Sequence, residues 1–219
     1  MIVIENLFFR YPDADFKLKI DDLKFNSGSK TAIIGTSGFG KTTMLNLLAG
    51  IILPQQGTVK INEEQINNLS DKNRRNYRIE NIGFVFQDFR LIPYLNVSDN
   101  IRLPFRINSS LKMENDTLTE LQRLAADLGI SNKLHKYPFK LSQGEKQRVA
   151  ICRALINKPK IILADEPTGN LDPDNKKRIM DILFNAVEKN NSTLITVTHD
   201  HDVLEGFEQV IDFKNFQAR

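Results

Sequence analysis

The chain has 219 residues, of which 41% are hydrophobic and 26% are charged, and its formal net charge is +3. These values are ordinary for a soluble globular protein of one large domain or two small ones. So slight a positive charge gives no reason to expect a nucleic-acid-binding protein, which normally shows a clustered basic face.

The sequence also lacks the marks of secretion and of membrane insertion. No run of about 18 apolar residues occurs, and the N-terminus has no basic stretch that leads into an apolar run. The single cysteine, Cys152, cannot form an internal disulfide, which favours a reducing compartment. We therefore expect a cytoplasmic protein, and any membrane-spanning part must belong to another chain.

Short apolar strands alternate with helices along the sequence. Alternating hydrophobicity predicts a strand at the N-terminus and another over residues 16–25, and a short apolar strand over 31–34 leads into a glycine-rich loop. Apolar residues at helical spacing follow from Lys41 until Gly50 closes the helix. Further predicted strands cover 59–61, 83–86, 161–164 and 193–196, and further helices cover 115–128, the stretch after Glu145, and 174–189.

This alternation predicts an α/β fold, in which a mainly parallel sheet carries helices on both faces. The predicted helix over 115–128 is amphipathic, with leucines at Leu118, Leu121, Leu124 and Leu128. It belongs to a mostly helical stretch, from about 88 to 157, that lies between two core strands. We expect this stretch to be a helical subdomain inserted into a single domain of residues 1–219.

Residues 35–42 read GTSGFGKT, which fits the phosphate-loop pattern G-x-x-x-x-G-K-[ST] between an apolar strand and a helix. In such a loop the backbone N–H groups converge on the β-phosphate, and Lys41 supplies a charge for the β- and γ-phosphate oxygens. The Thr42 hydroxyl is placed to ligate Mg²⁺. A glycine-rich turn that merely connects two elements is the alternative. The residues expected to bind a nucleotide here are Gly35, Thr36, Ser37, Gly38, Phe39, Gly40, Lys41, Thr42 and Thr43.

Polar side chains follow three of the predicted strands. The strand IILA ends in Asp165, which we expect to hold Mg²⁺ through water, and in Glu166, which we expect to polarise the attacking water. A pair of acids that caps a helix or lines a turn is the alternative. His199 follows the strand at 193–196 and can hydrogen-bond the γ-phosphate or the water, although a lone histidine is usually structural. Gln87 follows the strand at 83–86, and its amide oxygen can reach the metal or the water.

In the order GTSGFGKT, Gln87, LSQGE, ILADE, GNLD and His199, these stretches resemble the ATP-binding subunit of ABC transporters over the whole chain. The resemblance implies a P-loop NTPase core with a small N-terminal antiparallel β-subdomain and an inserted helical subdomain. It makes Gln87 the Q-loop glutamine, residues 141–145 the signature, residues 169–172 the D-loop and His199 the switch histidine. Tyr11 stands where the family has an aromatic that stacks on adenine, whereas an ordinary aromatic on a small sheet is the alternative.

Two positions depart from the family pattern. Phe39 replaces a small residue in the phosphate loop, and we expect it to alter the dimer face without abolishing nucleotide binding. Gln143 stands where glycine is commonest in the signature, although Ser142 and Gly144 are kept.

The signature predicts a second anion site, because Ser142 and the N–H groups of the following helix can hold a phosphate. The geometry of the sequence does not say whose phosphate that is. The family resemblance implies that the site faces the phosphate loop of a second copy, so that two ATP molecules are sandwiched head to tail. ATP binding then closes the dimer and hydrolysis opens it. The residues implied to contact the partner's nucleotide are Ser142, Gln143, Gly144, Glu145 and Asp172.

The sequence of residues 84–104 resembles the corresponding stretch in one branch of the family. That branch contains lipoprotein-releasing, macrolide-exporting and cell-division ATPases. This implies an ATPase on the inner face of the cell membrane that drives a separate permease subunit. The cargo class would be a lipoprotein, lipid, peptide or drug. We expect the apolar loop at 88–95, which directly follows Gln87, to contact the permease.

Two other functions remain open at this point. A soluble ABC ATPase that is not coupled to transport usually carries long coiled coils or duplicated cassettes, and the sequence shows neither. A regulatory nucleotide-binding scaffold is disfavoured because Lys41, Asp165, Glu166 and His199 are all intact.

Overall fold

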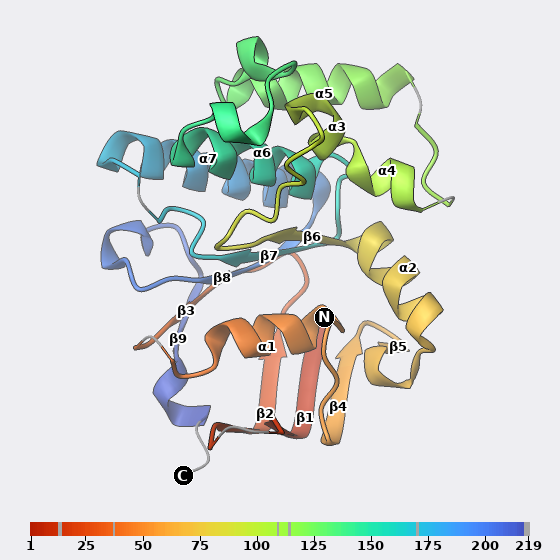
Figure 1. The fold of residues 1–219 in the computed structure, drawn as a ribbon. Helices are drawn as coiled ribbons and strands as arrows, with labels where there is room; N and C mark the ends of the chain where they lie inside the picture. The colour runs from red at the N-terminus through yellow and green to blue at the C-terminus, as the bar shows by residue number, and fades with distance from the viewer. Residues whose placement is uncertain (13–14, 37, 109, 114, 170, 217–219) are drawn as a thin grey trace.

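The computed structural model describes residues 1–12, 15–36, 38–108, 110–113, 115–169 and 171–216, and it contains two sheets (Figure 1). The smaller sheet has four strands, and its paired neighbours run antiparallel in the order β2-β1-β4-β5. The larger sheet has five strands in the order β6-β7-β8-β3-β9, and every pair in it is parallel. The strands are β1 (Ile2–Arg10), β2 (Lys17–Phe25), β3 (Lys30–Ile34), β4 (Gln56–Ile61), β5 (Glu64–Gln65), β6 (Ile82–Val85), β7 (Ile161–Asp165), β8 (Thr193–Val197) and β9 (Gln209–Asp212).

Helices lie on both faces of the parallel sheet (Figure 1). On one face α1 is buried between the two sheets, in a hydrophobic cluster that also includes residues of β1, β2, β3, β7 and β8. On the other face α6 and α7 share a second cluster with α5. The helices are α1 (Lys41–Leu48), α2 (Asp71–Asn81), α3 (Val97–Ile101), α4 (Leu103–Ile107), α5 (Asn115–Asp127), α6 (Gln143–Leu155) and α7 (Pro173–Asn190), with short 3₁₀ turns η1 (Ile66–Asn68), η2 (Ser131–Lys133), η3 (Pro138–Lys140), η4 (His201–Val203) and η5 (Phe213–Phe216).

The predicted α/β class and the parallel sheet with helices on both faces are confirmed, and so is the small antiparallel sheet that the family resemblance implied. Helices α3 to α6 lie between β6 and β7 in the chain. The predicted helix over 115–128 is confirmed as α5, although its four leucines are not equally buried. Leu118 is 45% exposed, whereas Leu121, Leu124 and Leu128 are buried, so the apolar stripe of α5 begins one turn later than its leucines suggest.

Several elements have no counterpart among the predictions. Helix α2 has no buried residue among its eleven, so the sequence gives no apolar stripe by which to recognise it. Strand β9 is short and mostly exposed and adds to the edge of the sheet beside β3. Within the described ranges, no helix is both long enough and apolar enough to cross a membrane.

Candidate nucleotide-binding site

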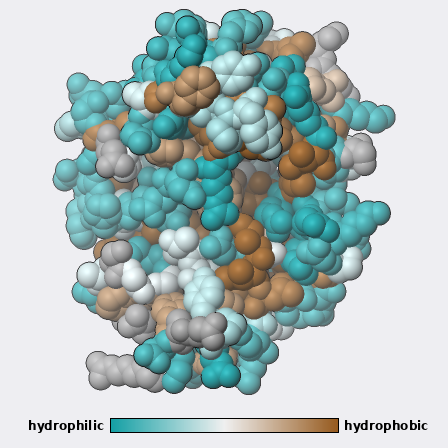
Figure 2. Space-filling model, in the orientation of Figure 1, coloured by the Kyte–Doolittle hydropathy of each residue, from teal (hydrophilic) through white to brown (hydrophobic). Residues whose placement is uncertain are grey.

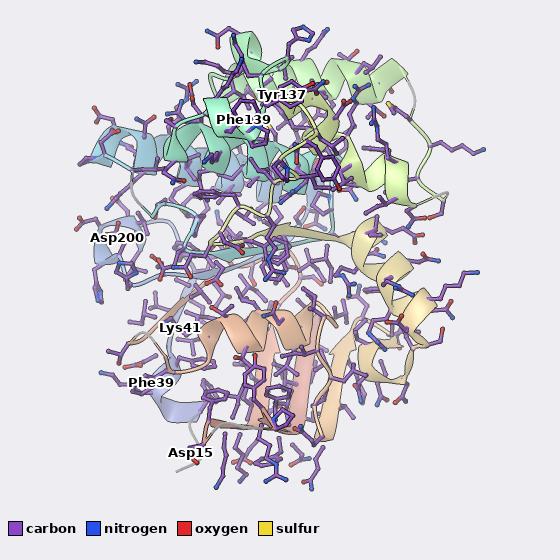
Figure 3. All side chains as sticks on the ribbon, viewed as in Figure 1. Asp15, Phe39, Lys41, Tyr137, Phe139 and Asp200 are labelled. Atoms are coloured by element: carbon purple, nitrogen blue, oxygen red, sulfur yellow. The ribbon has the colours of Figure 1, made fainter. Side chains whose placement is uncertain are left out.

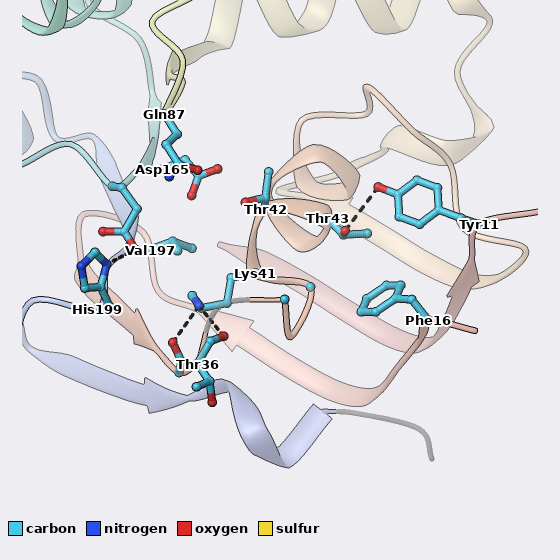
Figure 4. A pocket seen from close by; sticks show the side chains of 14 residues that line it. Tyr11, Phe16, Thr36, Lys41, Thr42, Thr43, Gln87, Asp165, Val197 and His199 are labelled. Carbon is cyan, nitrogen blue, oxygen red and sulfur yellow. Dashed lines mark hydrogen bonds and ion pairs between the residues drawn. The ribbon is translucent and has the colours of Figure 1, made fainter. Parts of the chain in front are cut away.

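A cavity of about 590 Å³ opens at the carboxyl ends of β3, β7 and β8 (Figure 4). The carboxyl edge of an open parallel sheet is where α/β proteins bind their ligands. The cavity gathers the polar side chains predicted from four separate stretches of sequence. Its lining residues are Tyr11, Phe16, Gly35, Thr36, Gly38, Gly40, Lys41, Thr42, Thr43, Gln87, Asp165, Glu166, Val197 and His199.

The phosphate loop enters α1 through a glycine at a position where any side chain would be strained. Gly40 has a φ of 93° and precedes the first residue of the helix. A Cβ atom at Gly40 would lie 2.3 Å from Cζ of Phe16, so the aromatic ring rests against the loop. The left-handed backbone and the close contact both require glycine. The loop therefore presents the N-terminal N–H groups of α1 to the cavity.

Lys41 lies almost completely buried at the start of α1. Its Nζ donates hydrogen bonds to the carbonyl oxygens of Gly35, at 2.7 Å, and of Thr36, at 2.9 Å (Figure 4). Burial lowers the pKa of this ammonium, although the carboxylates of Glu166 and Asp165 act in the opposite direction. The result is a cation fixed inside the phosphate loop.

Asp165 and Glu166 are consecutive but have different surroundings. Asp165 is buried, and burial raises its pKa, while a hydrogen bond with Thr42 acts against that rise. Glu166 has a left-handed backbone with φ of 50°, and its N–H donates to the carbonyl of Val197 at 2.9 Å. A hydrogen bond of 2.8 Å joins its Oε1 to Nδ1 of His199. The two acids therefore have different partners: Asp165 lies near Thr42 (Figure 4), and Glu166 pairs with His199.

Two aromatic side chains, Tyr11 and Phe16, line one side of the cavity. Of these, only Tyr11 was predicted from the sequence. Tyr11 packs edge-on against Phe9, with ring centroids 4.8 Å apart, and its hydroxyl lies 3.3 Å from Oγ1 of Thr43. Phe16 lies beside it, with centroids 6.1 Å apart. Phe16 was missed because it begins the alternating run 16–25 and was interpreted as part of a strand, whereas the structure begins β2 at Lys17 and leaves Phe16 in the connection before it.

The structure places the predicted signature residues 141–145 and residues 169, 171 and 172 of the predicted D-loop outside this cavity, and Asn170 lies outside the described residues. Ser142 and Glu145 form a reciprocal cap at the start of α6: the Glu145 N–H donates to the Ser142 hydroxyl, and the Ser142 N–H donates to the Glu145 carboxylate. Lys133 also pairs with Glu145 at 2.9 Å. Asp172 caps α7 in a similar way by accepting the N–H of Asn175.

Gln143 is exposed and Gly144 is partly buried. Phe39 does not line the cavity either, because its ring packs against the hydrophobic cluster around α1, and it lies near Lys41 in Figure 3. Ser37 lies outside the described residues.

A buried arginine on α6 fastens the loop that follows Gln87. The guanidinium of Arg153 donates to the carbonyl oxygens of Arg90 and Phe89, each at 2.6 Å. Both of those residues have a left-handed backbone, with φ of 45° and 60° respectively. Burial lowers the pKa of Arg153 to about 10. These two hydrogen bonds could not be predicted from the sequence, because Arg153 lies more than 60 residues from Phe89 and Arg90 in the chain.

Comparison with known proteins agrees with this geometry. Residues 18–169 match the ABC transporter family. The lipoprotein-releasing system ATP-binding protein LolD 1 of Rhodopirellula baltica is 39% identical, over 91% of this chain and 87% of that protein. The macrolide export ATP-binding/permease protein MacB of the same organism is 36% identical, over 94% of this chain but only 30% of that longer protein.

Solved structures give the same result. A dimeric structure of MJ0796, a bacterial ABC transporter cassette, superposes with a TM-score of 0.89 at 34% identity, over 97% of this chain and 95% of that one. A second structure of the same cassette, in a post-hydrolysis state bound to ADP and Pi, matches equally well. The chain belongs to the ABC transporter family, as an ATP-hydrolysing subunit of the branch that includes the lipoprotein-releasing and macrolide-export proteins.

Proposed function

We propose that the chain is the motor subunit of a transporter, bound to the inner face of the cell membrane, where two copies and a separate permease work together. Residues 1–219 form one ABC ATPase domain, with the helical subdomain inserted at about 88–157. The observation that carries the proposal is the convergence of Lys41, Asp165, Glu166 and His199 on one cavity at the carboxyl edge of the sheet.

The phosphate loop holds the triphosphate of ATP. The N-terminal N–H groups of α1 and the ammonium of Lys41 face the β- and γ-phosphates, and Lys41 exchanges the carbonyl oxygens of Gly35 and Thr36 for phosphate oxygens. The adenine ring lies against Tyr11, with Phe16 completing the aromatic wall.

The residues beside the phosphate site also fit Mg²⁺. Thr42, Gln87 and Asp165 line the same cavity and offer a hydroxyl, an amide oxygen and a carboxylate, which are the oxygen donors that this hard cation prefers. Phosphate oxygens and water would complete the coordination of a cation held by these three side chains. The cation, when bound, neutralises charge on the β- and γ-phosphate oxygens.

Glu166 acts as the general base for the attacking water. Its carboxylate pairs with His199, whereas Asp165 is hydrogen-bonded to Thr42, so proton transfer is assigned to Glu166 and metal binding to Asp165. His199 hydrogen-bonds this carboxylate and fixes its orientation beside the γ-phosphate position. In the reaction, water adds to the γ-phosphorus, its proton passes to Glu166, and ADP leaves with the bridging oxygen.

The signature of one copy completes the site of the other. Ser142 and the exposed start of α6 lie outside the cavity of their own chain, so they are free to meet the γ-phosphate held by a second copy. Gln143, Gly144, Glu145 and Asp172 belong to the same contact. The dimeric cassette that this chain resembles supports the arrangement.

The loop at 88–95 and the surface beside it receive the permease. Tyr94 is 77% exposed, whereas Leu91 is partly buried against the cluster around α6. Next to this loop, residues of α2, β6 and α4 line an apolar groove of about 260 Å³. Figure 2 shows a mostly hydrophilic face on which hydrophobic side chains are exposed over α4, where Ile107 is 61% exposed. Apolar surface of this kind suits a short helix of a partner.

The cargo is extracted or exported rather than imported. Relatives named as lipoprotein-releasing and macrolide-export proteins support a lipoprotein, lipid, peptide or drug as the transported class.

The test of this function uses Glu166→Gln, which keeps the shape of the side chain and removes the base. With ATP and Mg²⁺ the variant should form a stable dimer on size exclusion, while the wild type, which hydrolyses its ATP, stays mostly monomeric. The variant should also release no phosphate. A variant that stays monomeric, or that hydrolyses ATP at the wild-type rate, contradicts the assignment of Glu166.

A further inference from the structure

A second cavity lies directly behind the nucleotide site. Its volume is about 230 Å³, and three residues line both cavities: Gln87, Glu166 and His199. Because these three residues line both, the two cavities are adjacent. Beyond these three the second cavity is lined by residues of α6, the loop after β7 and α7, among them Gln147, Thr168 and Lys176. A volume of this size holds several water molecules or one small oxyanion.

Gln147 gives this cavity an unused hydrogen-bond donor. The residue is 1% exposed, and its Nε2 is buried with no hydrogen-bond partner among the residues that the structure describes. A buried amide that donates to nothing costs about 1–3 kcal/mol. Such a group is normally satisfied by ordered water or by a ligand. The motor chemistry proposed above does not use it.

Both carboxylates that line the second cavity are already paired, so the groups left to bind a ligand are mainly hydrogen-bond donors. Of its two carboxylates, Glu166 is joined to His199 at 2.8 Å, and Asp200 is paired with Lys176 at 2.5 Å. Asp200 lies on the same side of the molecule as Lys41 (Figure 3). With both carboxylates paired, the amide of Gln147, the hydroxyl of Thr168 and the remaining N–H groups of Lys176 are available to an anion.

We propose that this second cavity binds inorganic phosphate after it leaves the nucleotide site. The inference rests on the proposed ATPase function and adds a binding site to it. Phosphate formed beside Glu166 passes between Gln87 and His199 and is held by Gln147 and Lys176 before it reaches solvent. Cleavage and phosphate release are thus separate steps that depend on different side chains.

The test compares two rates in the full-length chain with ATP and Mg²⁺. Rapid chemical quenching measures cleavage of ATP, and a fluorescent phosphate-binding protein measures the appearance of free phosphate. In Gln147→Leu, which is similar in size but donates no hydrogen bond, cleavage should keep its wild-type rate. Release should slow at least about tenfold, the factor expected for one hydrogen bond to a charged group, because phosphate that leaves the nucleotide site loses the donor that receives it. Lys176→Met, at a partly exposed position where misfolding is less of a concern, should act in the same direction.

Thr31→Val is the matched control, because Oγ1 of Thr31 is also buried and unpartnered among the described residues but Thr31 lines neither cavity. Both rates should be unchanged in it. If the wild type cleaves no ATP, the proposed function itself fails, and the phosphate site with it. If cleavage is normal but release is equally fast in the wild type, Gln147→Leu and Lys176→Met, the phosphate site is wrong and the ATPase function stands. If cleavage slows as much as release, the cavity supplies the attacking water instead and the proposal is overturned.

Discussion

Replacing Arg153 by methionine tests how firmly α6 holds the loop after Gln87. The guanidinium makes two hydrogen bonds of 2.6 Å to the backbone carbonyls of Phe89 and Arg90. A hydrogen bond to a charged group contributes about 1.5–3 kcal/mol, so the pair contributes about 3–6 kcal/mol. Part of this offsets the cost of burying the charge, and methionine refills most of the space. We expect Arg153→Met to lower the free energy of unfolding by about 2–4 kcal/mol.

Urea unfolding followed by circular dichroism measures this difference, provided that the two curves have the same slope. Arg90→Met is the matched control, since it removes an exposed ion pair to Asp88 but leaves the backbone carbonyl that Arg153 binds. It should cost no more than about 1 kcal/mol. If Arg153→Met costs no more than Arg90→Met, the two short hydrogen bonds do not hold the loop and the reasoning is refuted.

Three further predictions follow from the site and its surroundings. Lys41→Ala should weaken the binding of a fluorescent ATP analogue at least about tenfold, because it removes the fixed cation of the phosphate loop, and unchanged affinity would exclude the site. Tyr94→Ser should keep the ATPase rate but abolish co-purification with the permease, whereas Tyr137→Ser, at another exposed tyrosine, should not affect co-purification. Glu145→Gln should lower stability by about 1 kcal/mol at neutral pH. Lys133 and the Ser142 N–H hold the pKa of Glu145 below its ordinary 4.5, so this stabilisation is lost as the pH falls through that lowered pKa, and urea curves for Glu145→Gln and wild type should converge there.

The site residues that could be predicted from the sequence are those that belong to a motif and also follow the end of an apolar strand. The phosphate loop, Asp165 and His199 each follow an apolar strand, and parallel strands bring their carboxyl ends to one edge, so their convergence follows from the order of residues alone. It was harder to predict whether an individual side chain faces the core or the solvent. Leu118 matches the leucine spacing of α5 but lies beyond the reach of the core, and Phe39 turns inward to the cluster around α1.

Contacts between distant segments could not be predicted at all. Helix α2 is mostly polar and has no buried residue, so its sequence carries no apolar stripe by which to recognise it. The two carbonyls held by Arg153, and the ring of Phe16 against Gly40, join residues whose pairing depends on the finished fold.

The hydrogen bonds of Lys41 to Gly35 and Thr36 have a consequence for the cycle of the site. The ammonium of Lys41 donates to these two carbonyl oxygens, so ATP binding exchanges them for phosphate oxygens, and the loss of the two hydrogen bonds offsets part of the free energy that the phosphates contribute. That exchange is most favourable when a γ-phosphate supplies the stronger acceptor. Once that phosphate is lost, the two carbonyls compete for the ammonium again and help ADP to leave. We therefore expect the phosphate loop to return, after each turnover, to the arrangement in which Lys41 donates to Gly35 and Thr36.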